Sequence, residues 1–351
     1  MATPVRVMVV DDSALYRRAI TDVLSEDANI QVLTSAPNGA IALEKIPQNP
    51  PDLITLDMEM PEVDGLQTLR ELKNRYPEIK TIVFSHLTEK GAELTLQALE
   101  LGAIDFVTKP RSSGSLEQSL ANIRRSLLPK VIEFSRAELR SRAAARPART
   151  DIPAPTPVTR LARREVIVIG ISTGGPNSLM AFFEQIPKNL HQPILIVQHM
   201  PAIFTRKLAE QLSRVGTVPA HEAVDGEPIV GGNAYIAPGD FHMEVISHSF
   251  QPHIHVFQGP QENYCRPAVD VLFRSVAEHY GKKAVGVIMT GMGKDGLEGS
   301  KVMKAAGAPI IAQDEASSVV WGMPRFIVEN NMADAVAPLD TMFHAITQFI
   351  I

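Results

Sequence analysis

The sequence predicts an α/β protein of two tandem domains, each built on a doubly wound, mostly parallel sheet. Short apolar runs of strand length alternate with amphipathic segments of helical spacing on both sides of the middle of the chain. Three prolines in DIPAPTPV, residues 151–158, favour extended, unpaired backbone between the halves. The length of 351 residues also suggests two cores. We expect domains at 1–125 and 164–351, joined by a linker at 126–163.

Each element follows from a local pattern. Apolar runs predict buried strands, and apolar residues that recur every three or four positions predict helices. In the first half the expected strands are 5–10, 52–58, 80–85 and 105–110, and the helices are 13–26, 65–76 and 93–102. In the second half the expected strands are 165–172, 193–199, 234–238 and 284–291, and the helices are 178–186, 204–215 and 268–280. Neither half looks like a repeat of the other.

Composition excludes several classes of protein. A formal net charge of −5 argues against a general nucleic-acid binder, and no apolar stretch is long enough to span or insert into a membrane. The N-terminus has no signal region, and the single cysteine, Cys265, fits a reducing cytoplasm. Since NYCRPAVD contains no nucleophile motif, we predict an ordinary small side chain there. No coiled-coil or apolar interface pattern stands out, so we expect a cytoplasmic monomer.

Five polar side chains follow successive strands of the first half: Asp11, Asp12, Asp57, Ser85 and Lys109. In a parallel sheet these strand ends share one edge. Three carboxylates there repel one another unless a cation such as Mg²⁺ joins them. A lysine and a hydroxyl can then receive an anion, which suits phosphoryl transfer to a carboxylate, with Asp57 the most central nucleophile. One such aspartate could simply cap a helix, but five complementary groups do not fit that explanation.

These residues closely resemble a response-regulator receiver domain, which has a flavodoxin-like fold. The motifs VVDDSALYRR, LDMEMPEVDGL, FSH and DFVTKP occur in the order of that family and cover about residues 4–125. The resemblance implies that Asp57 accepts a phosphoryl group from a sensor histidine kinase. It also implies that Asp12 and Asp57 contact Mg²⁺, with Asp11 assisting.

The resemblance extends to the rest of that edge. It implies that Ser85 and Lys109 contact the phosphoryl oxygens, that Phe106 stands at an aromatic switch position, and that the bond from Lys109 to Pro110 is cis. His86 stands where a small residue is expected and could alter the lifetime of the phosphoryl group.

The second half opens on a different motif. Residues 170–174, GISTG, fit G-x-S-x-G, a turn that exposes a serine between a strand and a helix. They do not fit a dinucleotide loop, because Ser172 replaces the second glycine. A P-loop would need Lys and Ser or Thr where Pro176 and Asn177 stand. Alone, the motif is equally compatible with a tight structural turn.

Two more strand ends give the serine a possible mechanism. A serine hydroxyl needs a base, and the base needs an orienting group. His199 follows the strand 193–199, and Asp295 lies just past the strand 284–291. Because parallel strands end at one edge, Ser172, His199 and Asp295 are expected to meet there.

The stretch SHSFQPHIHV contains three further histidines, His248, His253 and His255. Two of them, in H-x-H spacing, share one strand face and could hold a metal. No spaced cysteine or carboxylate completes such a site. A surface strand is therefore the favoured interpretation.

The second half also resembles the catalytic domain of the chemotaxis protein-glutamate methylesterases. The matching stretches are IGISTGGP, IVQHMPAIFT, DGEPIVGGNAYIAPGDFHMEV, RPAVDVLFRS, GVIMTGMGKDGLEG and AQDEASSVVWGMP, within residues 165–350. The resemblance implies that Ser172 is the nucleophile, His199 the general acid–base and Asp295 the orienting carboxylate. The backbone N–H of Met292 would help to form the oxyanion hole.

The resemblance implies a substrate as well: glutamyl γ-methyl esters of methyl-accepting chemoreceptors, with glutamine deamidation as a second activity and no cofactor for the esterase. The tandem order suggests that the unphosphorylated receiver blocks the catalytic edge and that phosphorylation relieves this. Two alternatives stay open. The second half could be a receptor-binding module without catalysis, or GISTGG and GMGKDG could bind a nucleotide in a transferase.

Overall fold

The computed structural model describes residues 4–109, 116–143, 164–249 and 251–350. The chain forms two compact units, Met1–Arg149 and Thr150–Ile351, which are described separately. None of the helices that the structure describes has the length and apolarity required to cross a bilayer.

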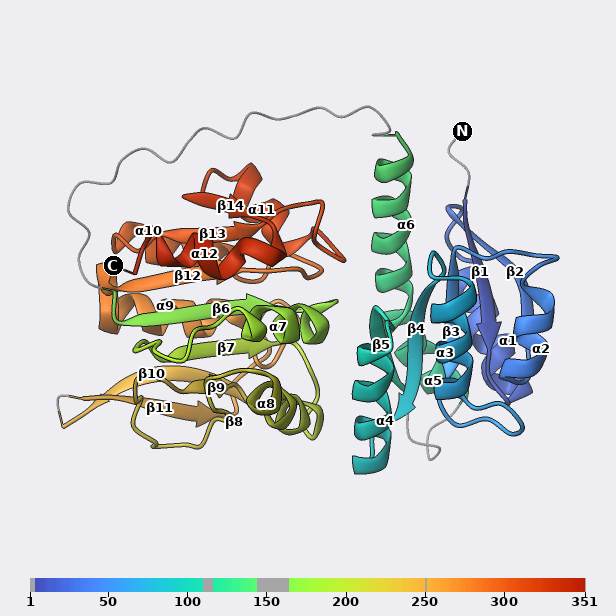
Figure 1. The fold of residues 1–351 in the computed structure, drawn as a ribbon, viewed down its shortest axis with the longest axis horizontal. Helices are drawn as coiled ribbons and strands as arrows, with labels where there is room; N and C mark the ends of the chain where they lie inside the picture. The colour runs from blue at the N-terminus through green and yellow to red at the C-terminus, as the bar shows by residue number, and fades with distance from the viewer. Residues whose placement is uncertain (1–3, 110–115, 144–163, 250, 351) are drawn as a thin grey trace. The chain divides into compact units, whose positions relative to one another are not determined.

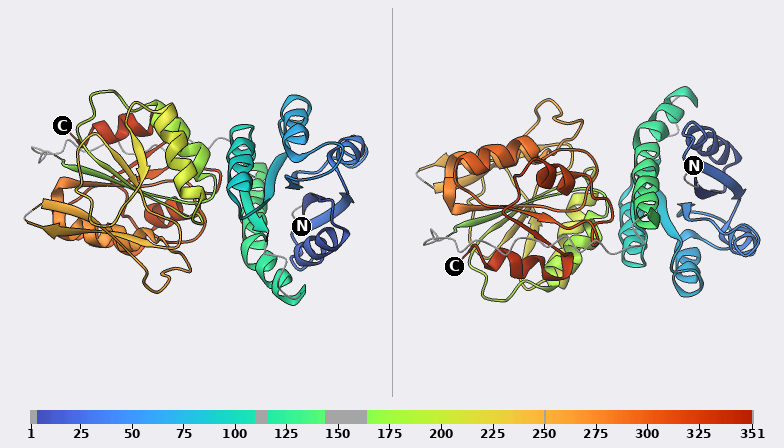
Figure 2. Two further views of the ribbon diagram at one scale, coloured as in Figure 1. Left: turned by 90° about the horizontal axis from the view of Figure 1, so that it is seen from below. Right: turned by 90° about the horizontal axis from the view of Figure 1, so that it is seen from above.

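The first unit is one parallel sheet with helices on both faces (Figures 1 and 2). Its strand order is β2-β1-β3-β4-β5, and every pair in it is parallel. The strands are β1 Val5–Val10, β2 Ile30–Ala36, β3 Leu53–Asp57, β4 Lys80–His86 and β5 Asp105–Lys109. The helices are α1 Ala14–Leu24, α2 Gly39–Lys45, α3 Gly65–Arg75, α4 Glu89–Glu100, α5 Leu116–Ser126 and α6 Leu128–Ala143. The edge strand β2 and helix α2 lie outside the predicted elements.

Helix α6 occupies the first part of the predicted linker. Leu127, Val131 and Phe134 recur at helical spacing and are buried in the core of the first unit, beside Ile123 of α5. The chain from 126 to 134 therefore belongs to the core of the first unit. The boundary between the two units falls later in the predicted linker.

The second unit is a seven-stranded sheet in the order β14-β13-β12-β6-β7-β9-β8, with a separate antiparallel hairpin, β10-β11 (Figure 1). Every strand pair in the large sheet is parallel. Its strands are β6 Val166–Ile171, β7 Ile194–Gln198, β8 Ala220–Glu222, β9 Ala234–Ile236, β12 Ala284–Ile288, β13 Ile310–Gln313 and β14 Ala335–Ala337, and the hairpin strands are β10 His242–His248 and β11 Gln251–Phe257. The mostly parallel, doubly wound architecture predicted for both halves is confirmed.

Helices cover both faces of this sheet (Figure 2). They are α7 Gly175–Glu184, α8 Phe204–Val215, α9 Val269–Tyr280, α10 Leu297–Ala305, α11 Met323–Glu329 and α12 Met342–Thr347. Val166 and Val168 of β6 share a buried core with Phe273 of α9 and Met303 of α10. A strand buried on both faces reads as a continuous apolar run, which is why β6, β7 and β12 could be predicted.

Candidate active site

Three neighbouring strands carry the candidate catalytic residues. In the order β12-β6-β7, Ile288 pairs with Gly170, and Ile171 pairs with Gln198. Ser172 and His199 therefore each follow a paired residue at the same sheet edge, and the Ser172 N–H donates to Thr290 O at 2.9 Å. The structure therefore brings these strand ends together, as the sequence predicted.

The turn after β6 depends on its glycines for steric reasons. Gly174 has φ +75°, and a Cβ there would lie 2.5 Å from Val319. A Cβ on Gly175 would lie 1.9 Å from Gln198 Oε1. Helix α7 starts directly after this turn, so Ser172 stands between a strand and a helix, half-buried at the sheet edge.

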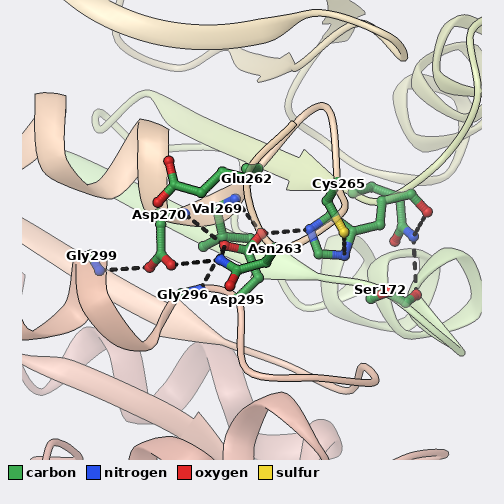
Figure 3. A network of polar contacts seen from close by, with 12 residues as sticks. Ser172, Glu262, Asn263, Cys265, Val269, Asp270, Asp295, Gly296 and Gly299 are labelled. Atoms are coloured by element: carbon green, nitrogen blue, oxygen red, sulfur yellow. Dashed lines mark hydrogen bonds and ion pairs between the residues drawn. The ribbon is translucent and has the colours of Figure 1, made fainter. Parts of the chain in front are cut away.

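Asp295 is a buried carboxylate that holds His199. Its Oδ2 lies 2.8 Å from His199 Nε2, and the Asp295 side chain is 2% exposed. The same carboxylate accepts from four further donors: Val269 N at 2.7 Å, Asp270 N at 3.1 Å, Gly296 N at 3.0 Å and Asn263 Nδ2 at 3.0 Å (Figure 3). Two of these donors belong to the first turn of α9, whose N-terminus favours negative charge.

These contacts set the ionisation of the pair. Burial by itself would raise the pKa of Asp295, but the hydrogen bond and charge of His199 and the N–H groups of Val269 and Asp270 outweigh it and lower that pKa. Burial by itself would lower the pKa of His199, but the charge of Cys265 and the contacts with Asp295 and Cys265 raise it. Asp295 is therefore a stable anion that can support a protonated imidazole.

The other imidazole nitrogen faces Cys265. His199 Nδ1 lies 3.6 Å from Cys265 Sγ, and within the described ranges no hydrogen bond links Ser172 Oγ to His199. The sequence predicted an ordinary small side chain at Cys265 and gave no sign that the fold places its thiol against the candidate base. Hydrogen bonds of catalytic groups often tighten only when substrate binds, so Ser172 keeps its candidate role.

Two backbone N–H groups beside Ser172 are available for an oxyanion. In the described part of the chain, neither Met292 N nor Thr173 N donates a hydrogen bond. The strand end that leads into Met292 is close to the serine, since a Cβ on Gly291 would lie 2.7 Å from Ser172 Cβ. Met292 was expected from the resemblance, whereas Thr173, the residue after the nucleophile, was not named, although the G-x-S-x-G motif itself points to it.

A second buried carboxylate, Asp270, lies behind Asp295. Asn263 Nδ2 bridges the two, at 2.9 Å from Asp270 Oδ2 and 3.0 Å from Asp295 Oδ1 (Figure 3). Gly299 N also donates to Asp270, at 2.6 Å. Burial, together with repulsion from Asp295, outweighs these bonds and raises the pKa of Asp270 to about 6.

This raised pKa predicts a pH-dependent stability. In the unfolded chain the pKa of Asp270 is about 4, so the native state binds the proton of this carboxyl more tightly. The resulting contribution to the free energy of unfolding is complete below pH ~4 and is lost as the pH rises through ~6. Asp270→Asn should remove it. Between pH 4 and 7.5 the free energy of unfolding of the wild type should fall by up to about 3 kcal/mol relative to the variant.

The fluorescence of Trp321, the single tryptophan, reports urea unfolding of the second unit for this comparison. Asp340→Asn, at an exposed aspartate, is the matched control and should show no such divergence. If the free energies of unfolding of the wild type and of Asp270→Asn differed by a constant amount across this pH range, the raised pKa of Asp270 would be contradicted.

His248, His253 and His255 lie on the hairpin β10-β11, as predicted for a surface strand. His253 and His255 lie half-buried on β11, and His255 Nδ1 contacts Asp225 at 2.8 Å. The ring of His248 packs at 5.3 Å from that of His253. Among the described residues, the groups whose donor atoms could share a metal ion do not include these three.

The acidic edge of the first unit forms a compact charged cluster. Lys109 Nζ lies 2.6 Å from Asp57 Oδ2 and 2.9 Å from Asp11 Oδ2, and all three side chains are buried. Burial lowers the pKa of Lys109, but Asp57 and Asp11 outweigh it and raise that pKa, which keeps the ammonium charged. Burial raises the pKa of Asp57 against the attraction of Lys109.

The same edge offers oxygen ligands for a cation. Carboxylate oxygens of Asp11, Asp12 and Asp57 lie within 4.8 Å of one another. The carboxylate oxygens outnumber the one ammonium group that contacts them, which suits a divalent ion such as Mg²⁺. The residues present therefore fit the metal.

The other predicted receiver residues are placed as follows. Ser85 is buried at the end of β4, and its Oγ donates to Gly91 O at 2.9 Å. Phe106 is buried on β5, with Lys130 Nζ 5.8 Å from its ring centre. Pro110, and with it the predicted cis bond, lies outside the described residues.

Fold and site together define a class: a receiver-type α/β domain in tandem with an α/β domain whose sheet edge carries the residues of a serine hydrolase. The comparisons are more specific. The model of the CheB methylesterase family matches residues 167–346, and that of the response regulator receiver domain matches residues 7–121. The chain belongs to the CheB methylesterase family.

Relatives match over almost the whole chain. The protein-glutamate methylesterase/protein-glutamine glutaminase of Trichodesmium erythraeum is 44% identical over 98% of this chain and 99% of its own. The protein of the same name from Pyrococcus abyssi is 40% identical over 96% and 91%. The crystal structure of the Thermotoga maritima CheB methylesterase catalytic domain is 40% identical, with a TM-score of 0.52, over 53% of this chain and 99% of its own.

Proposed function

We propose that this chain is a phosphorylation-activated serine esterase that removes methyl groups from glutamate γ-methyl esters of chemoreceptors and also deamidates receptor glutamines, for adaptation in chemotaxis signalling. The observation that carries the proposal is the His199–Asp295 pair at the strand end beside Ser172. The names of the full-length relatives support both activities. A receptor-binding module without catalysis would have no need for five donors around Asp295.

The residues divide the reaction between them. Ser172 Oγ attacks the ester carbonyl carbon, while His199 Nδ1 takes the hydroxyl proton and Asp295 stabilises the resulting imidazolium. The N–H groups of Thr173 and Met292 bind the oxyanion, a contribution of about 3–4 kcal/mol for a well-placed donor. The C–O bond then breaks, and methanol leaves with the proton from His199. Water, deprotonated by His199, hydrolyses the glutamyl-serine ester and regenerates Ser172. Methanol release from methylated receptor helices is the decisive measurement.

The first unit would supply the control. A sensor histidine kinase would donate the phosphoryl group to Asp57. Asp12 and Asp57, with Asp11 assisting, would hold Mg²⁺, which would supply positive charge beside the acceptor carboxylate. Lys109 and Ser85 contact the phosphoryl oxygens. The unphosphorylated receiver would block the esterase, and phosphorylation would relieve the block. We further propose that the protein is cytoplasmic and monomeric.

Asp57→Asn should abolish this control. An amide cannot accept a phosphoryl group, so incorporation from acetyl phosphate in Mg²⁺ should fall to background, and the phosphodonor should no longer increase methanol release. Asp22→Asn, at an exposed aspartate of α1, is the matched control and should be phosphorylated normally. Stoichiometric labelling of the Asp57→Asn variant would exclude Asp57 as the acceptor.

A further inference from the structure

The turn that carries Cys265 is rigidly built. Glu262 and Cys265 exchange two backbone hydrogen bonds, at 3.1 and 2.9 Å, around Asn263 and Tyr264, which have φ +52° and +62°. Residues other than glycine adopt this left-handed region at a cost of order 1 kcal/mol each. The turn is fixed at one end by Arg274, which donates to both carboxylate oxygens of Glu262 at 2.7 and 2.6 Å.

The tip of the turn is tied to the catalytic carboxylate as well. Asn263 donates to Asp295, so one short turn holds both Asp295 and the cysteine that faces His199 (Figure 3). The position of the thiol is therefore set by the same contacts that order the active site. The esterase mechanism makes no use of that thiol.

The distance between the two donor atoms fits a metal ion. A tetrahedral ion with a metal–sulfur bond of about 2.3 Å and a metal–nitrogen bond of about 2.0 Å separates sulfur and nitrogen by about 3.5 Å. Cys265 Sγ and His199 Nδ1 are 3.6 Å apart. The histidines of zinc sites commonly donate their other N–H to a carboxylate, which is the contact between His199 Nε2 and Asp295. His199, Cys265 and Asp295 also form one of the groups whose donor atoms lie within 4.8 Å of one another.

We propose that Cys265 Sγ and His199 Nδ1 form a binding site for a thiophilic divalent ion such as Zn²⁺, which inhibits the esterase. The ion replaces the thiol proton and, when the imidazole is protonated, the proton on His199 Nδ1; both are released to solvent, and no group is oxidised. It occupies the nitrogen that must accept the proton of Ser172. Because two protein donors leave the other positions to water, the site is reversible and not structural. The inhibition rests on the proposed function, whereas binding does not.

Cobalt is the direct probe of binding, because a thiolate ligand gives a charge-transfer band in the near ultraviolet. The chain has one cysteine, so such a band can arise only from Cys265. The full-length protein in excess Mg²⁺, titrated with Co²⁺, should develop the band, and Zn²⁺ should displace it. Cys265→Ser should show no band, and His199→Ala should weaken Co²⁺ binding by at least 10–100-fold, since even partners outside the ligand set contribute that much. His253→Ala, on the surface hairpin, is the matched control and should titrate like the wild type.

Methanol release tests the consequence. Zn²⁺ at ten times its dissociation constant should leave about a tenth of the wild-type rate of methanol release. A chelator should reverse this inhibition. The Cys265→Ser variant, compared with its own metal-free rate, should lose this sensitivity. Absence of the cobalt band would overturn the site itself. A band accompanied by unchanged methanol release at saturating Zn²⁺ would overturn the inhibition while leaving the esterase assignment intact.

Discussion

Ser172→Ala is expected to reduce kcat for methanol release from methylated receptor helices by about 10⁴- to 10⁶-fold. The substitution removes the only atom that can form the glutamyl-enzyme ester, while His199, Asp295 and the two N–H donors remain. The residual rate would come from the oxyanion site and substrate binding alone. KM should change little, because the hydroxyl acts in the chemical step.

The control for this variant is Ser213→Ala, an exposed serine on α8, which should match the wild type. Asp57 should still be phosphorylated in Ser172→Ala, which shows that the receiver is intact. Methanol release within tenfold of the wild-type rate would contradict the serine mechanism. If the Ser172→Ala variant kept the wild-type rate and the additional substitution Cys265→Ser abolished it, the nucleophile would be the cysteine.

The strands that place the site could be predicted because burial on both faces makes them long apolar runs. β6, β7 and β12 fall into this class, and each is central in its sheet. β8 and β14 have three residues each and lie at the edges of the sheet, where neither length nor apolarity marks them. The central strands position Ser172 and His199. The site could therefore be predicted although these edge strands were absent from the predicted elements.

The support around Asp295 could not be predicted in the same way. Asn263 and Cys265 lie on a loop, and their contacts span 32 and 66 positions of the sequence. No local pattern reports such a contact. The left-handed turn also contains Asn and Tyr, where glycine would have signalled the conformation. Asp270 looks like an ordinary acidic residue in the first turn of a helix, and only burial next to Asp295 reveals its raised pKa.

Asp295→Asn is the second large effect that we expect, with a fall in kcat of about 10⁴-fold. Oδ1 accepts from three donors, and Oδ2 accepts from His199 Nε2 and Val269 N. An asparagine replaces one of these oxygens with an NH₂ group, so donors face donors whichever way the amide turns. Each buried donor left without an acceptor costs about 1–3 kcal/mol, so unfolding followed by Trp321 fluorescence should show a loss of at least that size.

The loss of rate has a separate cause in the tautomer of His199. With the amide NH₂ towards the imidazole, Nε2 must become an acceptor, and the proton moves to Nδ1. That nitrogen then cannot take the proton of Ser172, so kcat falls while KM for the receptor is retained. Asp340→Asn again provides the exposed control. If Asp295→Asn kept a tenth or more of kcat while folded, Asp295 would be a structural carboxylate, and another group would have to orient His199.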